Sequence, residues 1–151
     1  MSAVPHQHQQ TSRTREKPQG DEEASTELRL GEFQNVHALT LSEARLVINV
    51  VMENRRQKQQ RDLQDTELLI KTQDYLDIFA RFKEKESIEA VERLLAAHED
   101  LEPFERSQLG SLCCETAEEA KTLIPSLGTK KADPDLQELL DEMMRLRNIA
   151  E

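Results

Sequence analysis

The sequence predicts an all-α protein, and three features of the chain lead to this prediction. From residue 41 onward, apolar residues recur at the spacings that place side chains on one face of a helix. Residues typical of helix starts and stops, such as Thr40 and Pro125, divide this pattern into segments. After residue 39, no stretch alternates apolar and polar residues as a half-buried strand would.

The composition limits both the core and the kind of partner. The 151 residues suffice for one ordinary domain, or for one domain with a tail. Only 36% of the residues are apolar, against about 45–50% in an average globular domain, so part of the chain should stay outside the core. The formal net charge of −10 disfavours nucleic acid or an anionic membrane as a partner bound through bulk positive charge. No apolar run is long enough for a membrane helix, and residues 1–10 lack the apolar region of a secretory signal.

Residues 1–27 are predicted to form a disordered polar tail. This stretch holds few apolar residues, so it cannot bury enough surface to offset the entropy lost on ordering. His6 and His8 lie in this tail without cysteine or acidic ligands nearby, so no metal site is expected there.

Residues 28–40 are predicted to form an extended arm. Leu28 and Leu30 alternate with polar residues as in a short strand, and Gly31 interrupts the pattern. The segment is too short to fold by itself. The arm must therefore lie against its own domain or against another chain.

Residues 41–83 are predicted to form two long helices. The first follows a capping box at Thr40 and Glu43 and carries a core-facing stripe of Leu41, Ala44, Val47, Ile48, Val51 and Met52. Leu46 and Val50 lie outside this stripe, so the helix should be buried on more than one side, which indicates a partner. Its end is basic, with Arg55, Arg56, Lys58 and Arg61. The helix dipole stabilises cations at a helix C-terminus, which explains this cluster without any partner. The alternative is that the cluster contacts RNA or an acidic surface.

The second long helix is predicted to be capped by Asp62 or Asp65. Its apolar seam combines four-residue and three-residue steps and consists of Leu68, Thr72, Tyr75, Phe79 and Phe82. This seam predicts that the helix is the spine of the core. Aromatic side chains can also stack on bases, but the helical spacing favours core packing.

Residues 84–151 are predicted to form a small helical domain. Ser87 can cap its first helix, Pro103 suits the first turn of the next, and Thr116 and Glu119 form a second capping box. A final amphipathic helix follows Asp133. Gly110 lies inside a predicted helix, which costs about 1 kcal/mol relative to Ala, so a close helix crossing is expected there.

No arrangement typical of catalysis is found, and we predict no catalytic residue, metal or cofactor. The paired carboxylates Glu118 and Glu119 are neighbours, which point about 100° apart on a helix and cannot share a site. Cys113 and Cys114 are adjacent, so they are expected as reduced thiols of a cytosolic or nuclear protein. A thiol enzyme that combines one of them with His98 is a remote alternative. A module that binds other proteins fits the sequence better.

Several segments resemble the fourth-largest subunit of RNA polymerase II. One of them is residues 104–127. Within it, the motif from Cys113 to Leu127 is fairly specific, because it combines a capping box at Thr116, a stop at Pro125 and a loop in fixed order. Residues 41–46, 75–91 and 133–142 also resemble that family, and residues 28–33 do so more weakly. The resemblance extends over about residues 28–149.

The resemblance implies a non-catalytic subunit with an N-terminal helical part and a C-terminal domain of the helicase-and-RNaseD-C-terminal-like (HRDC-like) type. Such subunits pair with the seventh subunit, an OB-fold protein, to form a stalk on the polymerase core. They support initiation, contact RNA-processing factors, and act in messenger RNA export and decay, in the nucleus and also in the cytoplasm. Contact with RNA would be indirect.

By this resemblance the partner-binding residues are expected on the arm and on the first long helix, and they are Leu28, Leu30, Phe33, Val36, Leu46 and Val50. Packing inside the chain's own core is the alternative for Leu46 and Val50. The competing function is a free-standing helical module that binds nucleic acid. Such a module should concentrate Lys and Arg on the helical domain itself, whereas residues 99–105 and 133–142 are acidic.

Overall fold

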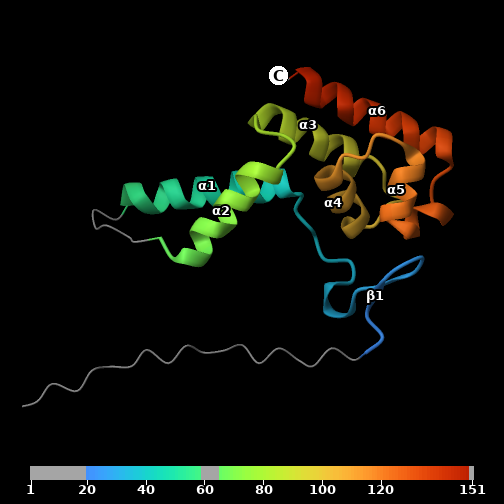
Figure 1. Cartoon of the computed structure of the whole chain (residues 1–151), viewed down its shortest axis with the longest axis horizontal. Coiled ribbons are helices and arrows are strands. Elements are labelled where there is room, and N and C mark those ends of the chain that lie inside the picture. Colours follow the sequence, from blue (N-terminus) through green and yellow to red (C-terminus); the bar gives the residue numbers. More distant parts are fainter. Residues whose placement is uncertain (1–19, 59–64, 150–151) are drawn as a thin grey trace, which may run out of the picture.

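The computed structural model describes residues 20–58 and 65–149, and the all-α prediction is confirmed. Figure 1 shows two helices lying together on one side of a second group of helices, with a short hairpin below that group. The pair consists of α1 (Leu41–Lys58) and α2 (Glu67–Phe79). The second group consists of α3 (Lys85–Ala96), α4 (Pro103–Leu112), α5 (Ala117–Leu123), the 3₁₀ turn η2 (Pro125–Thr129) and α6 (Asp133–Ile149).

The apolar core lies within the group formed by α3 to α6. Its most deeply buried apolar side chains include Leu101, Leu109, Leu127, Leu136 and Leu140. Burial of a leucine contributes about 1.5–3 kcal/mol, so this group is the stable part of the fold. The resemblance also predicts an HRDC-like fold for this group, and that detail stays a prediction.

The first predicted capping box is present in full. The backbone N of Thr40 lies 2.6 Å from Oε2 of Glu43, and the backbone N of Glu43 lies 3.2 Å from Oγ1 of Thr40. At the start of α5, Thr116 accepts from Glu119 N, but the Glu119 carboxylate accepts from Glu115 N instead of completing the box. Each of these bonds satisfies a backbone N–H at or next to the start of a helix, where the helix itself supplies no acceptor.

Two predicted caps are wrong by a few residues. Thr66, and not Asp65, caps α2 by accepting from the backbone N of Leu69 at 3.2 Å. Asp62, the other expected cap, lies outside the described residues. The helix predicted to start at Ser87 begins at Lys85, because Glu84 already has the extended backbone of an N-cap residue.

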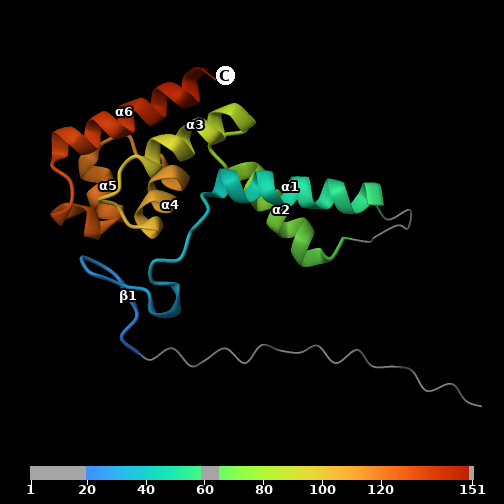
Figure 2. The same ribbon diagram turned by 180° about the vertical axis from the view of Figure 1, so that it is seen from behind.

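The prediction that α2 is the spine of the core is wrong. Leu68, Tyr75 and Phe79 are 76%, 52% and 47% exposed, and only Leu76 of this helix is buried. The helix contacts α1 but projects away from the group formed by α3 to α6, as the reverse view in Figure 2 also shows. The same projection leaves Val47 and Val51 of the predicted α1 stripe exposed.

Residues 20–40 form a hairpin followed by an extended segment. Strand β1 (Glu23–Ala24) pairs antiparallel with β2 (Leu28–Arg29), and the 3₁₀ turn η1 (Gly31–Phe33) follows. Gly31 has a φ of +56°, and a Cβ there would collide with the Glu22 side chain. The polar tail expected over residues 1–27 therefore ends in a strand, and residues 1–19 lie outside the described part of the chain.

The close approach expected at Gly110 is found. A Cβ at this position would lie 2.5 Å from Cγ2 of Thr40 and 3.1 Å from Cδ1 of Leu95. The glycine of α4 thus lets the start of α1 and a leucine of α3 come together above it.

Candidate partner-binding surface

The arm lies along α4 and is held there by polar contacts. The side-chain N of Gln34 lies 3.0 Å from Oε2 of Glu102, at the start of α4. Ser107 donates to the carbonyl oxygen of Leu39 at 2.7 Å, and the backbone N of Leu41 donates to Ser111 Oγ at 3.0 Å. The sequence left open whether the arm lies on its own domain or on another chain, and these contacts place it on its own domain.

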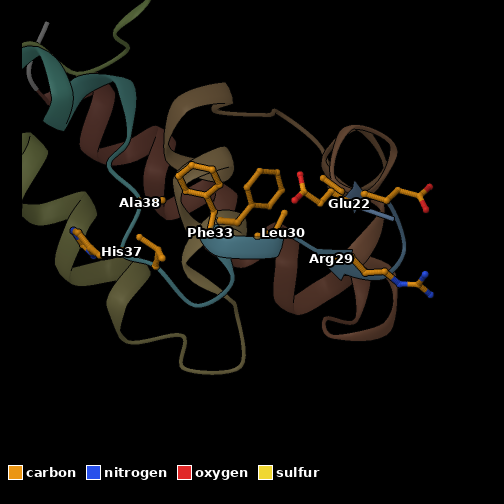
Figure 3. A pocket seen from close by; sticks show the side chains of 10 residues that line it. Glu22, Arg29, Leu30, Phe33, His37 and Ala38 are labelled. Atoms are coloured by element: carbon orange, nitrogen blue, oxygen red, sulfur yellow. The ribbon is translucent and has the colours of Figure 1, made fainter. Parts of the chain in front are cut away.

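The arm also forms one side of an apolar hollow of about 450 Å³. Figure 3 shows Leu30 and Phe33 together near its middle, with Glu22 and Arg29 toward one end and His37 toward the other. Phe104 of α4 lines it as well. Phe33 is 60% exposed, so the arm carries a large aromatic side chain that its own domain leaves uncovered. Such exposure is typical of a surface that another protein covers.

The helix pair carries a second apolar surface. Arg45 of α1 and Asp77 of α2 join the two helices through a 2.6 Å contact between Nε and Oδ1. The rings of Tyr75 and Phe79 lie 4.7 Å apart, centroid to centroid. The large apolar side chains that stay exposed on this pair are Val47, Val50, Val51, Leu68, Ile70, Tyr75, Ile78 and Phe79.

The structure divides the residues predicted to bind a partner into separate groups. Leu30, Phe33 and Val36 meet at the hollow, whereas Leu28 is half-buried in β2 and does not line it. Leu46 is half-buried and packs against the core of its own chain, which is the alternative that the sequence left open. Val50 is 51% exposed on the helix pair.

Sequence reasoning missed the exposed residues of α2. Its aliphatic residues alone point to every side of the helix, and they are Leu68, Leu69, Ile70, Leu76 and Ile78. A helix with apolar residues on all sides is either fully enclosed or in contact with a partner. Apolar residues on more than one side indicate a partner for α1, and they therefore indicate one for α2 as well.

The predicted basic cluster lies in the last turn of α1, where Arg55, Arg56 and Lys58 are exposed. Arg56 contacts Oδ2 of Asp65 at 3.0 Å, so one of these cations already has an acidic partner. Arg61 lies outside the described residues. Within the C-terminal group, Lys121 and Lys131 also contact carboxylates, those of Asp133 and Asp100. These pairs neutralise cations that a nucleic-acid module would need on this domain.

The two cysteines are poorly suited to nucleophilic catalysis. Burial raises the pKa of the Cys113 thiol to about 11 and also raises the pKa of Cys114, so both stay protonated at neutral pH. His98 contacts Lys131, with its Nδ1 2.9 Å from the lysine nitrogen. Burial and this neighbouring cation lower the pKa of His98. The remote alternative of a thiol enzyme therefore finds no support in the geometry.

Among residues 20–58 and 65–149, no group of three or more His, Cys, Asp or Glu residues is arranged to hold a metal ion. None of the described helices combines the length and apolar character that a membrane crossing requires.

A family model described as RNA polymerase Rpb4 matches residues 38–147, from the end of the arm into α6. The chain belongs to the RNA polymerase Rpb4 family. Members of this family are non-catalytic subunits of the polymerase, which agrees with the buried thiols and the apolar surfaces described above.

Individual relatives carry the same name. The chain is 46% identical over 127 residues to DNA-directed RNA polymerase II subunit rpb4 of Schizosaccharomyces pombe, a match that spans 83% of this chain and 93% of that protein. It is 40% identical over 114 residues to RPB4 of Saccharomyces cerevisiae, spanning 76% of this chain and 48% of the yeast protein. It is 32% identical over 126 residues to DNA-directed RNA polymerase II subunit 4 of Arabidopsis thaliana, a match that spans 82% of this chain and 90% of that protein.

Proposed function

We propose that the chain is the Rpb4 subunit of RNA polymerase II and forms the stalk heterodimer with the seventh subunit, an OB-fold protein. Through this partner it would join the polymerase core in the nucleus. It would support initiation, contact RNA-processing factors, and act in messenger RNA export and decay with passage to the cytoplasm.

The uncovered apolar side chains are the observation that carries this proposal. Phe33 and Val36 of the arm are 60% and 47% exposed, and Tyr75 and Phe79 of α2 are 52% and 47% exposed. Exposing such side chains to water is unfavourable, at about 25 cal/mol for each Å² of apolar surface. A permanent protein partner would remove that cost, and family membership supports the seventh subunit as this partner.

The test is reconstitution of the purified chain with the seventh subunit, followed by size-exclusion chromatography with light scattering. We expect a one-to-one complex, and we expect Phe33→Ala to weaken it about tenfold or more, because a buried aromatic side chain often dominates an interface. Leu123→Ala is the matched control, since Leu123 is similarly exposed, at 54%, but lies on α5 and does not line the hollow.

Failure of the wild-type chain to bind the seventh subunit would overturn the proposal. Tight, salt-sensitive binding of RNA by the isolated chain would instead favour the free-standing nucleic-acid module. Affinity purification of the native protein with mass spectrometry separates these outcomes in the cell, because a polymerase subunit is expected to co-purify with the polymerase core in stoichiometric amount and a free-standing module is not.

A further inference from the structure

The arm is attached to α4 through two serines that lie one helical turn apart. Ser107 and Ser111 occupy positions i and i+4, so their side chains lie on the same face of the helix. Ser107 Oγ donates to the carbonyl oxygen of Leu39, and the backbone N of Leu41 donates to Ser111 Oγ. The two hydroxyls thus hold backbone groups on either side of Thr40.

Thr40 itself fits closely above the same face of α4. Its side chain is buried, and its Cγ2 occupies the space that a Cβ of Gly110 would need. Gly110 lies between the two serines in the sequence, so three small residues together form the surface on which the arm rests. Because Gln34 also contacts Glu102, the attachment extends from the start of α4 toward its end.

The attachment to α4 uses polar groups, whereas three large apolar side chains of the arm remain exposed. Phe33, Val36 and Leu39 are 60%, 47% and 43% exposed. A segment that was held by its own hydrophobic burial would turn these side chains inward. Here the backbone is fixed by hydrogen bonds, and the side chains that could bind a partner stay available.

We propose that Ser107 and Ser111 are positioning residues that hold the arm in its partner-binding conformation before the partner arrives. This inference rests on the proposed function, because the partner is the seventh polymerase subunit. An ordered arm does not pay the entropy of ordering during association, so preorganisation raises the fraction of competent molecules and the association rate. The dissociation rate is set by the apolar contacts and stays unchanged.

The experiment compares the full chain with the double variant Ser107→Ala/Ser111→Ala. Amide hydrogen exchange at Leu41 should accelerate about tenfold or more, since the variant loses both hydrogen bonds that hold this part of the arm on α4. Surface-immobilised seventh subunit should bind the variant about three- to tenfold more slowly, with an unchanged dissociation rate. Thr122→Ala is the matched control, because its hydroxyl donates to Glu118 within α5, away from the arm.

The outcomes separate this inference from the proposed function. A wild-type chain that does not bind the seventh subunit overturns the proposed function. A wild-type chain that binds, with a double variant that associates equally fast, overturns only the positioning role. Unchanged exchange at Leu41 in the double variant overturns it too, and so does a change confined to the dissociation rate.

Discussion

Ser126 donates a hydrogen bond to Glu105, with 2.5 Å between Oγ and Oε1, and both side chains are buried in the C-terminal group. The other carboxylate oxygen of Glu105 accepts from the backbone N of Glu102 at 2.7 Å and from Nζ of Lys130 at 2.9 Å. Burial opposes the charge on Lys130, but its hydrogen bonds to Glu105 and Glu102 outweigh this effect and raise its pKa. One buried carboxylate therefore joins the start of α4 to η2.

We expect Glu105→Ala to lower the free energy of unfolding by about 3 kcal/mol. The substitution leaves Ser126 and Lys130 without their buried acceptor, and an uncompensated polar group in a core is costly. Chemical denaturation followed by circular dichroism measures the loss. Glu138→Ala, at an exposed position on α6, is the control and should change stability by less than about 0.5 kcal/mol. Equal stability of the two variants would contradict the structural role of Glu105.

We expect Gly110→Ala to destabilise the chain, although alanine is the better helix former by about 1 kcal/mol. The new methyl group would collide with the Thr40 side chain, and overpacking of this kind costs about 1–3 kcal/mol. Thermal unfolding measures the balance. Gly128→Ala is the matched control, because a Cβ at that position meets no atom within 4 Å. A Gly110→Ala variant more stable than the wild type would show that the crossing tolerates a side chain.

We expect Val50→Asp and Leu46→Asp to act through different mechanisms. Val50 is 51% exposed, so its substitution should leave the melting temperature unchanged and weaken binding of the seventh subunit. Leu46 packs against the core, so a charge there should lower the melting temperature of the isolated chain by several degrees. Melting curves and titrations with the partner, run on both variants, distinguish the two. If Val50→Asp binds the seventh subunit as tightly as the wild type, the proposal that Val50 of α1 contacts the partner is wrong.

We expect stability to fall as the pH rises above about 9, in part because of Cys113. Burial raises the pKa of this thiol from 9.0 to about 11, so the folded chain keeps the proton at a pH where the unfolded chain releases it. The unfolding free energy then decreases with pH, by up to about 1.4 kcal/mol per pH unit for one group. Urea unfolding over this pH range should give a flatter slope for Cys113→Ala. The same slope in the wild type and in Cys113→Ala would show that the Cys113 thiol does not contribute to the pH dependence of stability.

Local signals in the sequence predicted most helix boundaries. Thr40 and Glu43 specify a helix start through their own hydrogen bonds, and within a helix Pro103 is tolerated only in the first turn. Both predicted starts agree with the structure. The strand at Glu23–Ala24 carries no such signal. It forms because a hairpin brings Leu28–Arg29 alongside it.

The candidate surface was harder to predict than the helix boundaries, because an apolar stripe on a helix can be covered by the chain's own core or by a partner, and the spacing is the same in both cases. Tyr75 and Phe79 repeat at core spacing, yet α2 packs mainly against α1, and these two side chains stay exposed. The polar attachment of the arm was also beyond prediction. Serine is common on helix surfaces, and only the folded structure shows that Ser107 donates a hydrogen bond to the carbonyl oxygen of Leu39.

The chain contains one tyrosine and no tryptophan. That single phenol is Tyr75, which lies on the outer side of α2 beside Phe79 and is half exposed to water. The intrinsic tyrosine fluorescence of the isolated protein therefore comes from a single residue on the helix pair. Quenching by added iodide would report the accessibility of Tyr75 without any label. Weaker quenching after mixing with a ligand that contains neither tyrosine nor tryptophan would show that the ligand covers this surface.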